Sequence, residues 1–239
     1  MPDDTNPYQP PEATLSHETL IEGTGRIDLG EALTNAWNAT WANFPLWLGI
    51  GFVGWVGSVI AVLTIIGILA VLPVLLWGFA YAALRMYDGK GEFGDLFAGF
   101  QRYGDAVLGP LVLVVLVFVL TITFSFLPLL LIGTTDQLTA TFVQWGVQLV
   151  FTAFLLRFYF ALFLIVDRGL GPFEALAESW NRTEGQWLML VLMYLVGTMI
   201  SVIGVLLLGV GVIPATAISG FMWTAAYRQI FGRVERSVA

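Results

Sequence analysis

Long apolar stretches alternate along this chain with short segments rich in polar and charged residues. The apolar stretches supply about six lengths of roughly 20 residues, the length that crosses a bilayer core as a helix. The run 45–87 carries no charge before Arg85. As one helix it would extend about 64 Å, twice the thickness of the hydrocarbon core. It must therefore fold back, and Gly67 and Pro73 predict the turn and the start of the return helix.

The same reasoning predicts three helical hairpins. Each consists of two apolar spans separated by a short connection. The expected spans are 45–65 and 70–87, 107–130 and 139–165, and 187–208 and 212–231.

A short motif precedes each hairpin and indicates internal repeats. In each copy a leucine is followed four residues later by an aromatic residue and then by an amide. Apolar residues near the motif recur at helical spacing, which predicts amphipathic helices in the membrane interface. We expect Trp37, Phe100 and Trp180 to act as interfacial anchors. The copies are Leu33/Trp37/Asn38, Leu96/Phe100/Gln101 and Leu176/Trp180/Asn181.

The predicted fold is all-α: a polytopic membrane protein with six transmembrane helices in three parallel repeats. Each repeat is an interfacial amphipathic helix followed by a transmembrane hairpin. The repeats cover about 28–87, 88–166 and 167–231 of a single membrane domain, 27–236. Residues 1–26 are polar and acidic with four prolines, so we expect a disordered cytoplasmic tail.

The basic residues predict the orientation in the membrane. Three hairpins leave every connecting segment on the side of the N-terminus, whereas the opposite loops contain Asp136 and no Lys or Arg. Both termini are therefore predicted to be cytoplasmic, in a plasma (inner) membrane. The basic residues on the predicted cytoplasmic side are Arg26, Arg85, Lys90, Arg102, Arg168, Arg182, Arg228, Arg233 and Arg236.

Composition restricts the chemistry that this chain can perform. The 239 residues are 58% hydrophobic and 11% charged, with a mean hydropathy of +0.83, whereas soluble domains carry about 25% charged residues. There is no cysteine, and the single histidine is His17, which excludes thiolate chemistry and histidine metal clusters within the membrane. The net charge of −7 is concentrated in residues 1–31, which hold seven acids and one base. We predict no enzymatic activity, cofactor, metal or nucleic-acid partner.

Arg157 is the only base in the interior of a predicted span, since Arg85 and Arg228 lie near the ends of theirs. It lies about 15 Å of helix from the cytoplasmic end at Asp167, close to mid-bilayer. Such a residue is a functional candidate, here for contact with an anion or a lipid phosphate. The alternative is an arginine that snorkels to the interface or pairs with a buried carbonyl.

Gln144 and Gln148 are two further candidates for ligand binding. They share one helix face with three further polar residues, and Arg157 projects from nearly the opposite side. The face either lines a polar pathway or forms hydrogen bonds across a helix interface. The polar residues that accompany them are Gln137, Thr141 and Thr152.

Two further groups of residues have structural and functional interpretations. Gly51, Gly54 and Gly57 recur every third residue, which predicts close helix packing within the chain or between copies. Asp88 and Asp167 end two return helices. They are interpreted as polar helix ends or as a metal or headgroup site shared between repeats.

The segments Asp88-Gly89…Leu96-Phe97-x-Gly99-Phe100 and Val166-Asp167-Arg-Gly169…Pro172…Trp180 resemble a family of bacterial membrane domains. Its members include the membrane-anchor domain fused to some glycerophosphodiester phosphodiesterases, and related six-helix membrane proteins of unknown function. The resemblance covers roughly 28–231. It implies a membrane module without phosphodiesterase activity, because hydrolysis in the fused members belongs to a separate soluble domain.

Two classes of function are compatible with these features. The first is a non-enzymatic integral membrane scaffold or assembly module that organises lipid or partner proteins. The alternative is a transporter or channel for a small anionic or amphipathic solute, although transporter sites usually combine broken helices with polar groups at the midplane. The expected partners are the lipid bilayer, a second copy of the chain, and a cytoplasmic partner for the N-terminal tail.

Overall fold

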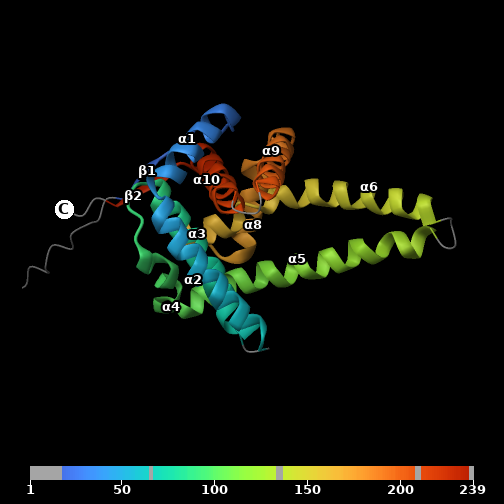
Figure 1. Cartoon of the computed structure of the whole chain (residues 1–239), viewed down its shortest axis with the longest axis horizontal. Coiled ribbons are helices and arrows are strands. Elements are labelled where there is room, and N and C mark those ends of the chain that lie inside the picture. The colour runs from blue at the N-terminus through green and yellow to red at the C-terminus, as the bar shows by residue number, and fades with distance from the viewer. Residues whose placement is uncertain (1–17, 65–66, 133–136, 208–210, 237–239) are drawn as a thin grey trace, which may run out of the picture.

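The structure is a computed structural model that describes residues 18–64, 67–132, 137–207 and 211–236. Within these ranges the chain is helical apart from one two-stranded ribbon (Figure 1). In chain order the elements are β1 (Glu18–Ile21), α1 (Leu29–Ala42), α2 (Phe44–Val62), a π-helical turn (Gly67–Val71), α3 (Leu72–Tyr87), a 3-10 helix (Phe93–Phe97), α4 (Ala98–Gln101), α5 (Tyr103–Ile132), α6 (Gln137–Leu155), a 3-10 turn (Leu156–Phe158), α7 (Ala161–Arg168), α8 (Pro172–Arg182), α9 (Trp187–Leu206), α10 (Val212–Phe231) and β2 (Arg233–Arg236).

The first apolar run folds back, as predicted. Helix α2 ends at Val62, and the return helix begins with the π-helical turn at Gly67 that leads into α3. A Cβ at Gly67 would overlap the backbone of Ala61, so the tight turn leaves no room for a side chain. Pro73 lies in the first turn of α3, where a missing N–H breaks no intrahelical hydrogen bond.

Among the residues that the structure describes, five segments are long and apolar enough to cross a membrane: Phe44–Val62, Gly67–Tyr87, Ala106–Phe126, Leu138–Arg168 and Trp187–Leu206. The sixth predicted span corresponds to α10, which is of similar length but is not among the five. Its seven residues from Phe221 to Tyr227 are all buried. Helix α10 packs against α1, α3 and α9, so most of its surface faces protein. Helix α10 therefore does not need an apolar exterior, and its sequence includes the polar residues Thr224 and Arg228.

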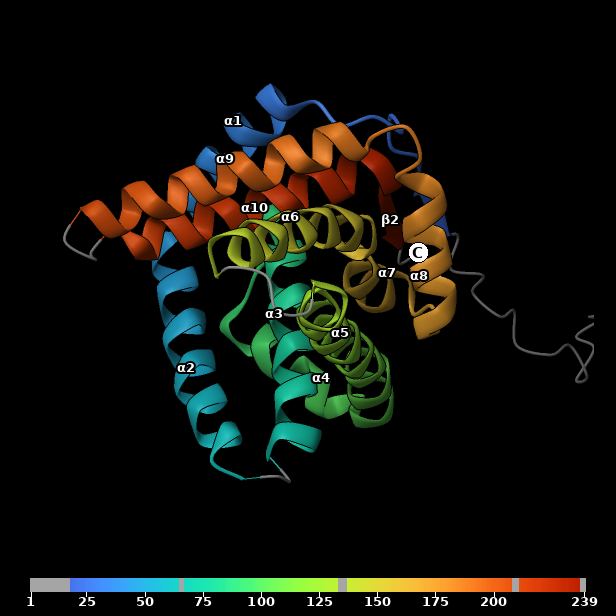
Figure 2. The ribbon, with the colours of Figure 1, turned by 90° about the vertical axis from the view of Figure 1, so that its right-hand side faces the viewer.

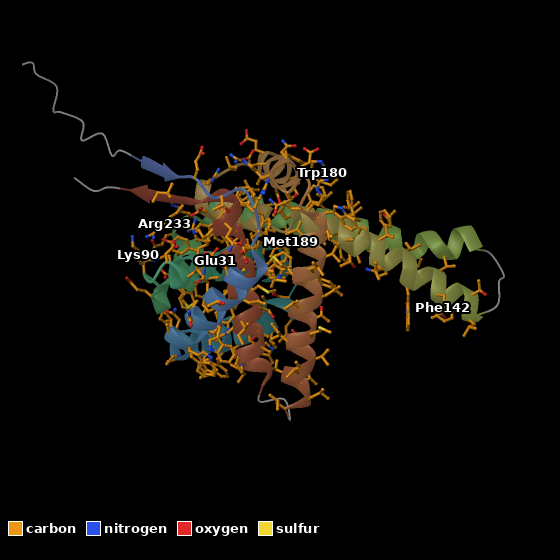
Figure 3. All side chains as sticks on the ribbon, turned by 90° about the horizontal axis from the view of Figure 1, so that it is seen from above. Glu31, Lys90, Phe142, Trp180, Met189 and Arg233 are labelled. Carbon is orange, nitrogen blue, oxygen red and sulfur yellow. The ribbon has the colours of Figure 1, made fainter. Side chains whose placement is uncertain are left out.

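The pairs α2–α3, α5–α6 and α9–α10 leave a common body in different directions. In Figure 2, α9 and α10 lie across the top while α2 and α3 run downward. The α5–α6 pair projects far from the body in Figure 1, and in Figure 3 Phe142 lies on this projection, distant from Lys90 and Arg233. The return helices are the more deeply packed: 56% of the Gly67–Tyr87 window is buried, against 17% for Phe44–Val62.

An aromatic cluster joins α7 to α10 in the centre of the body. Tyr227 stacks on Phe163 and on Phe231, with ring centroids 5.3 and 5.0 Å apart. Phe160, just before α7, contacts Phe231 edge-on at 5.7 Å. Tyr227, Phe160 and Phe231 are buried, so these rings fix the return helix of the third pair against the end of the second.

The two ends of the described chain lie side by side. Strand β1 pairs antiparallel with β2, and Glu18 is opposite Arg236. Part of the segment predicted to be a disordered tail therefore has defined structure, and the remainder of that prediction, 1–17, lies outside the described residues. Just after this segment, the Asp28 carboxylate accepts a hydrogen bond of 2.9 Å from the Glu31 N–H and caps the start of α1.

The glycines of α2 divide into two kinds. A Cβ at Gly54 would overlap the Phe79 ring of α3, and one at Gly57 would lie 3.2 Å from Leu75. These two glycines are used for close packing within the chain. Gly51 has open space beside it, so it takes no part in the packing within the chain, and its packing between copies stays a prediction.

Gly54→Leu should lower the free energy of unfolding by about 1–3 kcal/mol, because the added side chain overpacks the contact with Phe79. Gly51→Leu is the matched control, since both replacements raise helix propensity equally. Thermal unfolding of both variants in nanodiscs measures the difference. Equal stability of the two variants would contradict the α2–α3 contact.

Candidate functional site

Helices α3, α7 and α10 end at the same place. Asp88 is the residue after α3, Asp167 lies in the last turn of α7, and Arg228 lies in the last turn of α10. We call these three residues the Arg228 cluster. Asp88 and Arg228 lie at the ends of the return helices of the first and third pairs, and Asp167 lies on α7, the short helix that follows the second pair. The cluster therefore connects the ends of all three.

One guanidinium holds two carboxylates in this cluster. Arg228 donates from Nη2 to Asp88 Oδ2 at 2.9 Å and from Nη1 to Asp167 Oδ2 at 2.7 Å. Nη1 also donates to the Gly232 carbonyl at 3.1 Å. The Tyr227 hydroxyl donates to Asp167 Oδ2 at 2.9 Å. The side chains of Arg228, Asp88 and Asp167 are 11%, 15% and 14% exposed, so the ion pairs are largely withdrawn from solvent.

The sequence interpretation of this place was incomplete. The sequence pattern indicates that Asp88 and Asp167 are helix ends or a metal or headgroup site, but it pairs neither residue with Arg228. The signal that could have found the pairing is that two return helices end in an acid and the third ends in a base. Within the residues that the structure describes, no group of three or more Asp, Glu, His or Cys residues could hold a metal ion.

A smaller ion pair fixes the segment after α3. Arg85 Nη1 lies 3.2 Å from Asp95 Oδ1, and the Glu92 N–H donates to Asp95 Oδ2 at 2.7 Å. Burial raises the pKa of Asp95, while the Glu92 N–H and Arg85 act against that rise. Arg85 also donates to the Lys90 carbonyl. The loop that leads to the 3-10 helix Phe93–Phe97 is thereby tied back to α3.

Arg157 lies at a break in the fourth span. Helix α6 ends at Leu155, a 3-10 turn follows, and α7 begins only at Ala161. The prediction of an unbroken helix from Arg157 to Asp167 is therefore wrong. The depth of Arg157 in the bilayer, which was obtained by counting helical residues from Asp167, is wrong for the same reason.

Arg157 packs against the end of α8. Its Nη2 donates to the Trp180 carbonyl at 2.6 Å, and its Nε donates to Thr183 Oγ1 at 3.4 Å. The guanidinium carbon lies 3.5 Å from the centre of the Trp180 ring. In return, the Ser179 hydroxyl donates to the Arg157 carbonyl at 2.6 Å. Arg157 thus caps the C-terminal end of α8, where carbonyls lack intrahelical partners and a positive charge is favoured.

The three aromatic residues of the repeated motif have different surroundings. Trp37 and Phe100 are exposed, at 54% and 43%. Trp180 is instead covered by Arg157 and by the Phe158 ring, whose centroid lies 5.3 Å away. Trp180 therefore makes intramolecular contacts that the other two lack, and its function as an interfacial anchor stays a prediction.

Gln148 lines an open groove of about 430 Å³ between α6 and α9. Gln144 lies one turn nearer the tip of α6, and Arg157 is not among the lining residues. The structure therefore does not bring Arg157 and the glutamines into one site. The lining residues are Trp145, Gln148, Leu149, Thr152, Ala153, Leu156, Val191, Tyr194 and Leu195.

The fold defines the class of this protein as a helical, multi-pass membrane protein. Besides the five apolar helices, large apolar side chains are exposed along them, including Leu63 at 78%, Leu206 at 75% and Leu149 at 70%. Exposed apolar surface of this extent is typical of lipid contact. No family model matches the sequence, and searches of curated proteins and of solved structures find no match.

Arg228→Leu should lower the free energy of unfolding by about 3–5 kcal/mol, because it leaves two largely buried carboxylates without a counter-charge. Tryptophan fluorescence during denaturation in nanodiscs measures the loss. Combining it with Asp88→Asn and Asp167→Asn should recover part of the stability, since amides tolerate burial better than carboxylates. The control is Arg182→Leu: its ion pair with Glu178 is at the surface, so an equal loss there would contradict the role of the cluster.

Arg157→Leu should accelerate amide hydrogen exchange at the end of α8 by roughly tenfold or more, because a hydrogen bond from a charged group contributes about 1.5–3 kcal/mol. Exchange in α2 and α3 should be unchanged. Arg157→Lys, which keeps the charge without the planar stacking group, should be intermediate. Unchanged exchange in α8 would exclude capping and favour the predicted contact with an anion or lipid phosphate.

Proposed function

We propose that this protein is a non-enzymatic integral membrane scaffold that holds three transmembrane hairpins in a fixed arrangement and so organises lipid or partner proteins. The observation that carries the proposal is the Arg228 cluster, which joins the ends of α3, α7 and α10 while the helix pairs diverge (Figures 1 and 2). Fixed hairpins with exposed apolar flanks offer several separate surfaces to lipid or to other membrane helices.

The engagement of the charged side chains supports this proposal over the transporter alternative. Arg228 is bound by Asp88 and Asp167, and Arg157 is bound by the end of α8. Neither guanidinium is presented to a solute. A transporter site would instead gather polar groups around a cavity between broken helices.

The proposal includes a membrane orientation. We place α10 as the sixth span, the three pairs as parallel repeats, and both termini in the cytoplasm of a cell whose plasma (inner) membrane holds the chain. The pairing of β1 with β2 supports a common side for the two ends. The basic residues Arg85, Arg168, Arg228 and Arg233 make contacts near one another at the ends of α3, α7 and α10, and the positive-inside rule would place that end in the cytoplasm.

Labelling of single cysteines tests the orientation, because the chain has no cysteine of its own. In spheroplasts, Leu63→Cys and Leu207→Cys, near two hairpin tips, should react with a membrane-impermeant maleimide. Arg26→Cys and Lys90→Cys should react only after the membrane is permeabilised. Reaction of the tips and of Arg26→Cys from the same side would overturn the proposed topology.

Proteoliposomes test the scaffold directly. Spin labels at Leu63→Cys and Leu138→Cys should give a narrow distance distribution that Arg228→Leu broadens. Liposomes that contain the protein should release an entrapped anionic dye no faster than empty liposomes. Release that depends on Arg157 would overturn the scaffold and favour the transporter or channel alternative.

A further inference from the structure

Helix α6 packs mainly against its partner α5, and α5 in turn packs against α3 near the body. Only 11% of the apolar stretch within Ala106–Phe126 is buried, which is the smallest share among the five membrane-spanning candidates. On α6, Phe142, Trp145 and Leu149 are 63%, 68% and 70% exposed. The pair projects from the body in Figures 1 and 3. Its flank is therefore available to lipid or to another protein helix.

Two amides interrupt this apolar flank. Gln144 and Gln148 lie one turn apart on the same face of α6, and both are partly buried. The structure gives neither side chain a hydrogen-bond partner among the residues that it describes. Gln148 also lines the groove between α6 and α9. An amide that stays unpaired in hydrocarbon is costly, so these side chains require a partner from outside the described chain.

The depth of the two glutamines in the bilayer indicates whether lipid or protein can be their hydrogen-bond partner. Gln148 and Gln144 lie seven and eleven residues before the end of α6 at Leu155, which is about 10 and 16 Å of helix. With a hydrocarbon core about 30 Å thick, both lie among acyl chains when α6 crosses the bilayer. Lipids carry their hydrogen-bonding atoms near the headgroups. Acyl chains could fill the groove, but they could not satisfy the amides, whereas a protein helix could.

The chemistry of the amide favours a second copy of this chain. An amide has both donors and an acceptor, so it can pair with an identical group. Two copies inserted in the same orientation and related by a twofold axis along the membrane normal place equal residues at equal depth. Gln144 then meets Gln144, and Gln148 meets Gln148. Two arginines or two aspartates in these positions would repel.

We propose that α6 forms the contact surface of a homodimer in the membrane, in which Gln144 and Gln148 hydrogen-bond to the same residues of the second copy. Trp145 and Leu149 lie beside the paired amides and are buried from lipid in the dimer. This inference rests on the proposed function only in that α6 crosses the bilayer. It deepens that function, since a dimer of scaffolds presents twice the number of hairpins.

Oxidative cross-linking of single cysteines in proteoliposomes, at low protein-to-lipid ratio, tests the contact. Thr152→Cys lies one turn from Gln148 on the same side and leaves both glutamines intact, so it should cross-link. The control is Val150→Cys, which is 68% exposed and lies about 200° around the helix from Gln148. It should not cross-link, and equal cross-linking at both positions would overturn the proposal.

Removing the amides provides the second measurement. In the Thr152→Cys background, Gln144→Leu with Gln148→Leu should raise the dimer dissociation constant roughly tenfold, while the unfolding temperature of the monomer stays unchanged. An unchanged dissociation constant would overturn the proposal, because the dimer would then form without the paired amides. Dye release from the same liposomes distinguishes failure of one proposal from failure of the other. Dye release from liposomes that hold the dimer would overturn the scaffold. A protein that stays monomeric in liposomes that release no dye would overturn the dimer and leave the scaffold intact.

Discussion

The arrangement of this protein depends on one guanidinium that is shared by two carboxylates. Arg228 binds Asp88 and Asp167 where α3, α7 and α10 end, and the side chains are largely buried. A buried ion pair adds little net stability, because desolvation offsets most of the attraction, but losing one partner is costly. The cluster therefore contributes more to specificity than to stability. It selects the one arrangement in which α3, α7 and α10 bring their ends together.

This constraint explains why the hairpins can diverge. In a protein whose helices lie in lipid, little hydrophobic force drives helices together, since acyl chains are as apolar as leucine. Close packing and polar contacts must then hold the helices in place. Here the polar contacts and the aromatic stack around Tyr227 are concentrated at one end of the return helices. The pairs are fixed to one another at that end.

The sequence predicted much of the fold because hairpins in lipid follow from length alone. A run of apolar residues twice as long as the bilayer is thick has to turn, and Gly67 and Pro73 supplied the turn where expected. Residues that act across helices were less accessible. The pairing of Arg228 could not be read from spacing, since Asp88 and Arg228 are 140 residues apart. Arg157 was misplaced because nothing in the apolar pattern signals that α6 ends two residues before it.

Two sets of polar residues in the fourth span differ in where they find hydrogen-bond partners. Near the body, the Arg157 guanidinium donates to the Trp180 carbonyl, and the Arg157 carbonyl accepts a hydrogen bond from the Ser179 hydroxyl, all within a single chain. Farther along α6, Gln144 and Gln148 have no partner in the described chain. Both sets are polar groups in an apolar stretch, and the same cost of burial applies to each. A single chain can complete the first set, and only a second protein surface can complete the other.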